Sequence, residues 1–501
     1  MNPSTIHTSA LNGVDAPSVT VEVGITNGLP GITIVGLARK EVRESASRVR
    51  HALRSSKFEM PLSSITVNLA PVELPKSGGR YDIPIALGIL AASKQIDPAI
   101  LAGVEFLGEL ALTGALRPVP GVLPSLLAAS RRGRTLFLPK ANSSEAGLVK
   151  AARAVAVTDL RQLVDCLYAH GEPERVAYSG DRGRAAAYPE LKDVIEMAQA
   201  KRAMEIAAAG GHNLLLSGPP GAGKSMLAKR FPGLLPPMSE EEALETASLH
   251  SLKGITLEES WRRRPFRNPH HTCSVAALVG GGARPTPGEI SLAHNGVLFL
   301  DELPQFRRDA LESLREPLET RNIVVSRARY TVTFPARFQL LAAMNPCPCG
   351  FVGDPQRECR CTPEAVRRYQ GRISGPFLDR VDLRVHVCRP ARPILADDRR
   401  DGNGISSAQV RTRVVEAREI QMDRSAKCNA ELKDVELRVH CHPRQDGRAL
   451  LEHAAEKLAL SPRACARILK VARTIADLES AARVAERHIA EALALRGSGF
   501  S

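Results

Sequence analysis

Aromatic side chains are scarce in this chain: they make up 4% of its 501 residues, and only one of them is tryptophan. Proteins that hold single strands of nucleic acid by stacking the bases need several aromatic side chains as platforms. The composition therefore argues against base stacking as the main way in which this chain would hold a polynucleotide. Cationic contacts to the sugar-phosphate backbone would be preferred.

Long apolar runs are also lacking. The longest uncharged apolar stretch, residues 83–92, is far shorter than the roughly 20 residues that span a bilayer. The first residues, MNPSTIHTSALNG, contain no basic segment followed by an apolar run, as a signal peptide would. We therefore expect a cytoplasmic protein with no membrane partner.

Cysteine is too sparse for a disulfide scaffold, with ten residues in the whole chain. Two C-x-C pairs with nine residues between them stand in an insert at 347–361: Cys347, Cys349, Cys359 and Cys361. Four thiolates from one short loop can surround a tetrahedral Zn²⁺, so we predict a structural zinc site, with free thiols as the alternative. For the histidines and cysteine of residues 440–442 we predict surface positions, because adjacent side chains do not converge easily.

Positive charge is in excess: 68 Lys and Arg stand against 54 Asp and Glu, which gives a net charge of +14. Cations that neutralise phosphates release condensed counterions, so a basic chain favours polyanionic partners. The charge alone does not distinguish a nucleic-acid-binding protein from a basic protein whose cations face water, and both interpretations stay open.

Changes of pattern divide the chain into three parts and a linker. Residues 1–170 mix short strands with helical patterns, and residues 171–189 are rich in Gly, Arg and Ala without a sustained period, which is typical of a linker. Residues 190–395 alternate strands with helices, which predicts a parallel sheet with ligands at the carboxyl ends of its strands. Residues 396–501 contain helical patterns and predict a helical lid.

Hydrophobic periodicity predicts individual elements within these parts. The predicted strands are residues 64–68, 135–138, 213–217, 296–300 and 338–342. The predicted helices are residues 41–54, 84–92, 191–209, 407–421, 448–459 and 462–476.

The segment after the strand 213–217 fits G-x-x-x-x-G-K-[ST], the phosphate-binding loop. Its residues are Gly218, Pro219, Pro220, Gly221, Ala222, Gly223, Lys224 and Ser225. The glycines let backbone N–H groups point at phosphate oxygens, Lys224 would reach the β- and γ-phosphates, and the Ser225 hydroxyl would bind Mg²⁺. We therefore predict a site for ATP and Mg²⁺.

Two later strands end in polar residues that suit the same chemistry. The strand 296–300 ends in Asp301 and Glu302, which predicts that Asp301 holds Mg²⁺ and that Glu302 polarises the attacking water. The strand 338–342 leads to Asn345, where an amide can orient that water beside the γ-phosphate. This order of Lys/Ser, Asp/Glu and Asn is the one seen in AAA+ ATPases.

Arginines further along are candidates to neutralise charge on the γ-phosphate. Arg380 follows a predicted helix and Arg463 begins another. In this class of ATPase such an arginine usually comes from the neighbouring subunit. The alternative for each of them is a solvated surface residue.

Longer stretches make the likeness specific: RRRPFRNPHHTCSVAALVGGGARPTPGEISLAHNGVLFLDELPQF, AAGGHNLLLSGPPGAGKS and LLAAMNPCPCG. With them, nearly the whole chain resembles the ComM/YifB family of magnesium-chelatase-like AAA+ ATPases. The resemblance implies an α/β P-loop core with a helical lid, a homohexamer, and ATP-driven branch migration of DNA, single-stranded and branched, during natural transformation. It supports the P-loop, acidic-pair and Asn345 roles above. It also suggests Arg380 as a finger acting on the neighbouring subunit and Arg463 as a second sensor, with recombination proteins as further partners.

The N-terminal part resembles the proteolytic α+β domain of Lon through residues 68–79 and 107–146. Lon needs a serine nucleophile and a lysine base. Where Lon has the serine this chain reads residues 79–82 (GRYD), and where Lon has the lysine it reads residues 122–125 (VLPS). Lys76 and Ser77 are neighbours on an extended segment and would point to opposite sides. We predict a Lon-like domain without a catalytic dyad and without peptidase activity.

Residues 322–334 predict a β-hairpin between the acidic pair and Asn345, with Arg327 and Arg329 near its tip. In related AAA+ motors a hairpin at this position projects into the hexamer pore. The two arginines would then contact DNA phosphates without sequence preference. The alternative, a turn whose arginines face water, stays open. The arginines of residues 262–267 are a second candidate, for which the alternative, an exposed loop that pairs with acidic neighbours, is slightly favoured.

Two other functions fit parts of the pattern. One is a chelatase motor that inserts a metal into a tetrapyrrole; the Lon-like domain and the cysteine insert argue against it, since the resembling motor subunit lacks both. The other is a protein-remodelling ATPase whose N-terminal domain binds a polypeptide, which the sequence does not exclude.

Overall fold

The computed structural model describes residues 3–150, 152–168, 174–180, 188–258, 260–282, 285–327, 330–389 and 404–496. The chain forms two compact units. Unit 1 comprises Met1–Arg184, Ser239–Arg262 and Pro285–Pro287, and unit 2 comprises the remainder. Residues 239–262, which the sequence pattern places in the ATPase core, therefore pack with the N-terminal unit. The predicted linker lies partly outside the described residues.

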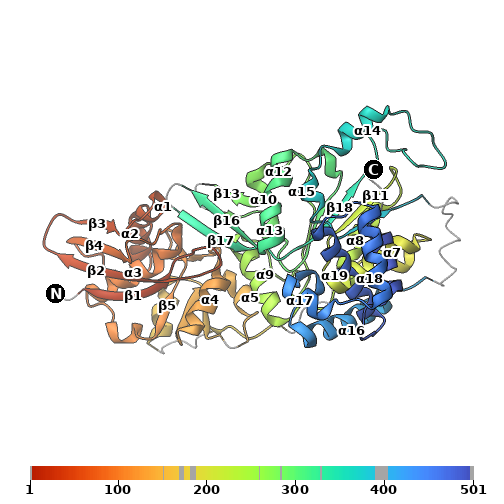
Figure 1. Ribbon diagram of the computed structural model, residues 1–501. Helices are drawn as coiled ribbons and strands as arrows, with labels where there is room; N and C mark the ends of the chain where they lie inside the picture. The colour runs from red at the N-terminus through yellow and green to blue at the C-terminus, as the bar shows by residue number, and fades with distance from the viewer. Residues whose placement is uncertain are drawn as a thin grey trace. The chain divides into compact units, whose positions relative to one another are not determined.

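Unit 1 is built on an eight-stranded mixed sheet in the order β10-β9-β8-β5-β1-β2-β4-β3 (Figure 1). The strands are β1 (Ser4–Ser9), β2 (Ser18–Thr26), β3 (Gly31–Val35), β4 (Ser64–Ala70), β5 (Val104–Phe106), β8 (Thr135–Pro139), β9 (Ala154–Val157) and β10 (Glu174–Arg175). Two short strands, β6 (Glu109–Leu110) and β7 (Leu116–Arg117), pair with each other. The predicted strands 64–68 and 135–138 are confirmed. Residues 174–175, inside the predicted linker, pair with β9 as the edge of this sheet.

The helices of unit 1 cover this sheet. They are α1 (Lys40–Arg43), α2 (Ser45–Ser55), α3 (Asp82–Ala92), α4 (Val122–Arg131), α5 (Ser143–Ala146), α6 (Leu160–Leu167) and α9 (Glu240–Leu252); the short strand β14 (Thr286–Pro287) also belongs here. Ten of the eleven residues of α3 are buried, because α3 packs against β1 and β2 in the centre of the core. Helix α9 begins with a capping box at Ser239 and packs on α4.

Unit 2 contains a five-stranded sheet in the order β12-β15-β18-β11-β19, and every neighbouring pair in it is parallel. The strands are β11 (Leu214–Ser217), β12 (Phe266–Arg267), β15 (Val297–Leu300), β18 (Gln339–Met344) and β19 (Leu383–His386). Their near-continuous apolar sequences suit a parallel sheet that is covered on both faces. This sheet and the helical C-terminal region confirm the predicted fold class.

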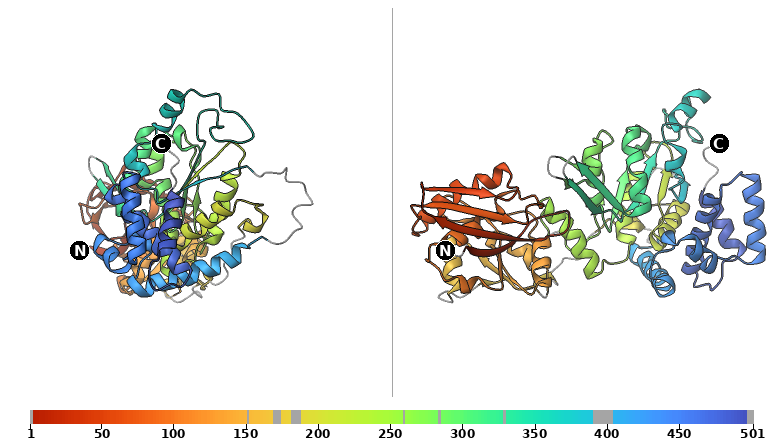
Figure 2. Two further views of the ribbon diagram at one scale, coloured as in Figure 1. Left: turned by 45° about the vertical axis from the view of Figure 1, so that its right-hand side comes forward. Right: turned by 60° about the vertical axis from the view of Figure 1, so that its left-hand side comes forward.

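The remaining elements of unit 2 frame the sheet and form the lid (Figure 2). Around the sheet lie α7 (Ala198–Gly210), α8 (Lys224–Arg230), α10 (Val275–Val279), α11 (Glu289–Leu292), α12 (Arg308–Ser313), α13 (Arg315–Thr320), α14 (Pro363–Gln370), α15 (Gly375–Leu378) and the short strand β13 (Gly280–Gly281). The lid contains α16 (Ser407–Ser425), α17 (Asp434–His440), α18 (Gln445–Lys457), α19 (Pro462–Leu478) and α20 (Glu486–Arg496). The predicted helix 191–209 begins late, at Ala198, because Glu196 and Met197 both have positive φ and interrupt it.

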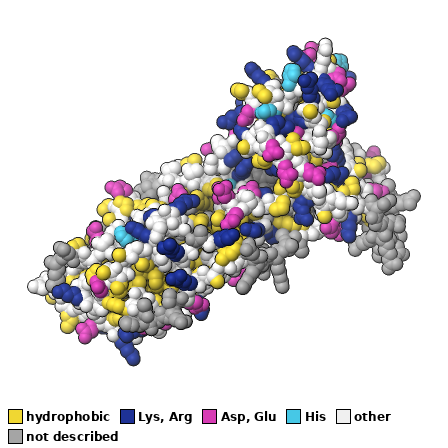
Figure 3. Space-filling view, turned by 90° about the horizontal axis from the view of Figure 1, so that it is seen from below, with side chains coloured by type: hydrophobic (Ala, Val, Ile, Leu, Met, Phe, Trp, Pro, Cys, Tyr) yellow, Lys and Arg dark blue, Asp and Glu magenta, His cyan; other side chains and the backbone are white. Residues whose placement is uncertain are grey.

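The predicted hairpin is present as β16 (Asn322–Arg327) and β17 (Tyr330–Pro335), paired antiparallel. Among the described residues, no helix is long and apolar enough to cross a membrane. On the face drawn in Figure 3, Lys and Arg side chains are interspersed with Asp and Glu. The net positive charge is therefore not gathered into one patch on that face.

Candidate active site

The phosphate-binding loop connects β11, which lies between β18 and β19, to helix α8. Gly221 and Gly223 have φ values of 75° and 87°, which side chains with a Cβ rarely adopt. A Cβ on Gly218 would lie 2.2 Å from the Val387 carbonyl oxygen. Glycine is therefore required at these positions for the backbone to turn into the helix.

Lys224 is 8% exposed and lies across the loop. Its ammonium donates to the carbonyl oxygens of Gly218 and Pro219 at 2.6 and 2.9 Å, and to the Asn345 amide oxygen at 3.0 Å. Burial lowers the pKa of Lys224 to about 8; Asp301 opposes this shift. A half-desolvated cation is thus held where a phosphate would meet it.

The Ser225 hydroxyl donates a 2.5 Å hydrogen bond to Asp301 Oδ2. Asp301 follows β15, which is two strands away from β11 with β18 between them. Because the carboxyl ends of parallel strands meet at one edge, residues 76 positions apart come into contact here. A hydroxyl oxygen and a carboxylate oxygen placed side by side are suitable ligands for Mg²⁺.

Glu302 has a left-handed backbone conformation, with φ 52°, and its side chain is 57% exposed. A non-glycine residue in this region is uncommon and signals a local constraint. The carboxylate lies 3.3 Å from His271 Nδ1. No sequence motif marks His271, which lies a few residues after β12, the strand next to β15.

Arg389 is a second residue that the sequence did not reveal. It donates to the Pro220 carbonyl oxygen at 2.7 Å from the segment after β19, and its guanidinium also lies 3.9 Å from Asp354. Its charge contributes to the lowered pKa of Lys224. No motif marks an isolated arginine of this kind, because only the fold brings it to the loop.

The four predicted cysteines form one cluster. Their sulfur atoms all lie within 4.8 Å of one another, and three of the separations are 3.4, 3.5 and 3.7 Å. A tetrahedron with Zn–S bonds of about 2.3 Å places its sulfurs about 3.8 Å apart, so the arrangement fits zinc. Burial acts to raise the pKa of Cys349, but the backbone N–H groups of Phe351 and Arg360, together with the Cys347 and Cys361 thiols, lower it to about 6, which favours a thiolate.

The cysteine cluster directly adjoins the phosphate loop. Gly350, between the two pairs, has φ 87°, and a Cβ there would lie 2.4 Å from the Pro220 ring. The cluster begins two residues after Asn345, which contacts Lys224. A metal bound here would therefore fix the loop that leaves the predicted nucleotide site.

Comparison with known proteins agrees with this geometry. Residues 190–393 match the family model described as magnesium chelatase, subunit ChlI, and residues 21–142 and 404–496 match two further models of the same subunit. YifB from Salmonella typhimurium is 50% identical over 500 residues, covering 99% of this chain and 97% of the relative. The competence protein ComM from Haemophilus influenzae is 49% identical over 501 residues, covering 99% and 98%.

The chain belongs to the ComM/YifB family of magnesium-chelatase-like AAA+ ATPases. The Lon likeness is more distant: a Lon protease from Mycolicibacterium smegmatis is 25% identical over 177 residues, which are 34% of this chain and 22% of that protein. As a member of the ComM/YifB family, the chain pairs an AAA+ core with a Lon-like N-terminal region.

The two arginines that family resemblance suggested lie away from the phosphate loop. Asn213, just before β11, donates through its amide to the Arg380 carbonyl oxygen at 2.9 Å, so Arg380 lies at the amino-terminal edge of the sheet. Its side chain is 10% exposed and contacts Glu319. Burial and the nearby charges of Arg315, Arg467 and Arg463 lower the pKa of Arg380. Arg463 itself is exposed at the start of α19.

The predicted DNA contacts are only partly described. The backbone of Arg327 ends strand β16, whereas Arg329 lies outside the described residues. In the second candidate segment, Arg267 forms two hydrogen bonds with the Glu289 carboxylate, at 2.6 and 2.8 Å. That arginine is paired with an acidic neighbour, as expected if the segment is a loop that pairs with acidic neighbours and not a DNA contact.

Two further predictions concern isolated side chains. Lys76 is fully buried, and its ammonium donates to the Pro71 carbonyl oxygen, so it does not face Ser77. The prediction of surface positions at 440–442 is wrong for Cys441, which is fully buried beside Leu432 and Leu437. Burial raises the pKa of the Cys441 thiol to about 11.

Proposed function

We propose that this protein is an ATP-driven homohexameric motor that moves branched DNA during recombination of incoming single strands. The meeting of Lys224, Ser225, Asp301 and Asn345 at one edge of a parallel sheet is the observation that carries the ATPase part. The DNA part is supported by a relative, 49% identical over nearly its full length, that is named a competence protein. Competence is the ability of a cell to take up DNA. We expect the motor to act in the cytoplasm, away from membranes and together with recombination proteins.

In this proposal the phosphates of ATP lie on the loop 218–225, with Lys224 against the β- and γ-phosphates. Bound Mg²⁺ would be held by Ser225 and Asp301 and would neutralise charge on the phosphates. Glu302 takes a proton from the attacking water, and Asn345 orients that water. Burial of Lys224 strengthens its attraction for phosphate, because the local dielectric constant is lower than in water.

The position of Arg380 supports assembly into a ring. Strand β11 has four residues, so its first and last Cα atoms are about 10 Å apart at 3.3 Å per residue. Arg380 is near one end and Lys224 follows the other. An arginine so placed serves a γ-phosphate on a neighbouring subunit rather than its own. Arg463 is proposed as the second sensor.

The test is displacement of a strand from forked DNA by the purified full-length protein with ATP. Wild type should displace the strand, whereas Lys224→Ala should neither hydrolyse ATP nor displace it. Glu302→Gln should bind ATP, form stable hexamers and turn over no ATP. If unfolded protein or porphyrin stimulates wild-type ATP hydrolysis and single-stranded or forked DNA does not, the proposal is wrong. Stimulation by unfolded protein would then indicate the remodelling function, and stimulation by porphyrin the chelatase function.

A further inference from the structure

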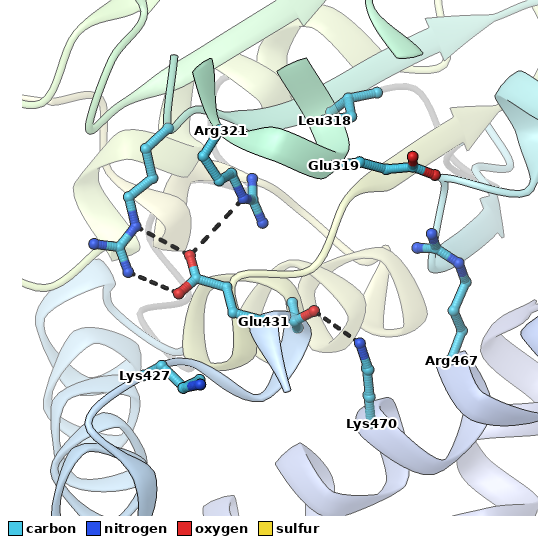
Figure 4. Close-up of a pocket in the computed structure, with 9 residues that line it drawn as sticks. Leu318, Glu319, Arg321, Lys427, Glu431, Arg467 and Lys470 are labelled. Carbon is cyan, nitrogen blue, oxygen red and sulfur yellow. Dashed lines mark hydrogen bonds and ion pairs between the residues drawn. The ribbon is translucent and has the colours of Figure 1, made fainter. Parts of the chain in front are cut away.

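A cationic pocket of about 550 Å³ opens in unit 2 between the sheet domain and the lid (Figure 4). Three parts of the chain line it: the end of α13, the segment joining β17 to β18, and the lid segments at η9 (Asn429–Glu431) and α19. Its charged side chains are Glu319, Glu431, Arg321, Arg337, Lys427, Arg467 and Lys470. Among these lining side chains cations exceed carboxylates by five to two. Two of the cations also pair with carboxylates outside the lining, Lys427 with Glu436 and Arg467 with Asp382.

The cations are held at the pocket rather than spread over open surface. The side chains of Arg321, Lys427 and Arg467 are 26%, 28% and 26% exposed. In Figure 4, Arg321 extends from one side of the space and Lys470 and Arg467 rise from α19 on the other. Lys470 donates to the Ala430 carbonyl oxygen at 3.1 Å, which keeps its ammonium at the wall.

Acidic neighbours neutralise only part of this charge. Glu431 binds Arg337 at 2.8 and 3.0 Å and lies 3.9 Å from Arg321, so one carboxylate serves two guanidinium groups. Arg467 gives one of its five N–H donors to Asp382, at 2.5 Å. Burial lowers the pKa of Lys470, and the charge of nearby Arg467 lowers it further. A bound anion would raise this pKa again, because it stabilises the charged ammonium.

This pocket is separate from the predicted ATP site. The Arg337 carbonyl oxygen accepts from the Asn295 N–H just before β15, and Arg337 itself lies two residues before β18 begins. The pocket therefore adjoins the amino-terminal edge of the sheet, whereas Lys224 lies at the carboxyl edge. An anion bound in this pocket therefore does not fill the predicted ATP site.

We propose that this pocket is a second phosphate-binding site, which takes a di- or triphosphate group or the phosphodiester backbone of a polynucleotide. Its volume is in the range of small-ligand sites, about 300–1,000 Å³. Guanidinium and ammonium groups converging from opposite walls suit oxygens on more than one side of a phosphate. The site does not require the proposed motor function, because its binding is measured without ATP turnover.

The test uses full-length Lys224→Ala protein, in which the phosphate loop is disabled, and inorganic pyrophosphate as the probe in isothermal titration calorimetry. Pyrophosphate should bind, and adding Arg321→Gln with Lys470→Gln should weaken it by about tenfold or more, since charge-assisted hydrogen bonds are lost. Ala430→Glu keeps every cation but adds a carboxylate to the wall, and it should weaken binding similarly. Lys457→Gln lowers the net charge by one, as Ala430→Glu does, but on the exposed end of α18, and it should change nothing.

A single-stranded oligonucleotide then identifies the source of the phosphate. If the oligonucleotide competes with pyrophosphate in Lys224→Ala protein, and this competition is lost when Ala430→Glu is added, the pocket binds a polynucleotide backbone. If the oligonucleotide does not compete, the pocket binds a small phosphorylated ligand. The proposal would be overturned if pyrophosphate did not bind to Lys224→Ala protein. It would also be overturned if the Ala430→Glu and Arg321→Gln/Lys470→Gln proteins bound pyrophosphate as tightly as the Lys224→Ala parent while both retained the parent melting temperature.

Discussion

Arg80 donates a 2.6 Å hydrogen bond to the Ser125 hydroxyl, although the two residues are 45 positions apart. They belong to the two segments in which Lon has its nucleophile and its base. The fold has therefore kept these segments together while their chemistry has changed, because a guanidinium stays protonated and cannot activate a hydroxyl. Ser125 in turn donates to the Gly121 carbonyl oxygen, and both side chains are buried.

The first prediction is that the protein does not cleave polypeptides. Fluorescent casein should remain intact with and without ATP, because no base meets a serine at the Arg80–Ser125 pair or at Lys76 and Ser77. Cleavage that depends on ATP and disappears in Ser77→Ala would contradict this. Removing the buried guanidinium in Arg80→Ala should instead lower the free energy of unfolding by about 1–3 kcal/mol, measured in urea, because Ser125 loses its donor.

The second prediction concerns pH. Phosphate binds the charged form of Lys224, and this charge is lost as the pH rises through the pKa of about 8 in the ligand-free protein. At pH 9 about one tenth of the lysine is charged, so the apparent Kd for ATP should be about tenfold above its value near pH 7. Titration calorimetry in magnesium-containing buffers measures this. In Lys224→Arg the side chain stays charged, and the dependence above pH 7 should disappear.

The third prediction is that His271 positions Glu302. His271→Ala should lower kcat for ATP hydrolysis by about tenfold with little change in KM, because a misplaced general base acts in the chemical step and not in binding. His271→Asn, which retains a hydrogen-bonding group, should recover part of kcat. The affinity for ATP, measured by titration calorimetry, should be unchanged in His271→Ala; weakened binding of ATP would mean that His271 acts elsewhere.

The fourth prediction concerns the cysteine cluster. Purified reduced protein should contain one zinc per chain by mass spectrometry of the metal, and Cys359→Ser should lower that content. Because Gly350 packs on Pro220, losing the metal should also raise the KM for ATP severalfold. Cys166→Ser, which changes a cysteine in unit 1, is the matched control and should alter neither value. Protein without metal but with full activity would refute the zinc site.

Local patterns predicted much of this structure. The strand–loop–helix around Lys224 and the strands before Asp301 and Asn345 carry strong signals, since buried parallel strands are short apolar runs and their ends hold polar residues. Contacts that depend on distant packing carry none. His271 and Arg389 reach the site only because β12 and β19 lie in the same sheet as β11. The composition of a single strand does not reveal the order of the strands in the sheet.

The interruption at Glu196 and Met197 illustrates a second limit. Their residue types favour a helix, yet both take positive φ where the chain turns into α7. Tertiary packing overrides propensity at such positions. In the same way, the helical pattern of residues 240–252 does not indicate that α9 packs with unit 1.

The last prediction concerns Glu431, which lies between the lid and the hairpin β16–β17. Arg321 immediately precedes the hairpin, Arg337 follows it closely, and both guanidinium groups meet this one carboxylate of the lid. If movement of the lid drives the hairpin against DNA, Glu431→Gln should lower forked-DNA displacement by about tenfold, because the ion pairs that join the lid to the hairpin are weakened. Basal ATPase should stay near wild type. Glu436→Gln removes an equal charge from the lid, where Glu436 pairs with Lys427 instead, and should spare displacement. Equal displacement by Glu431→Gln and Glu436→Gln would show that the hairpin moves without this link.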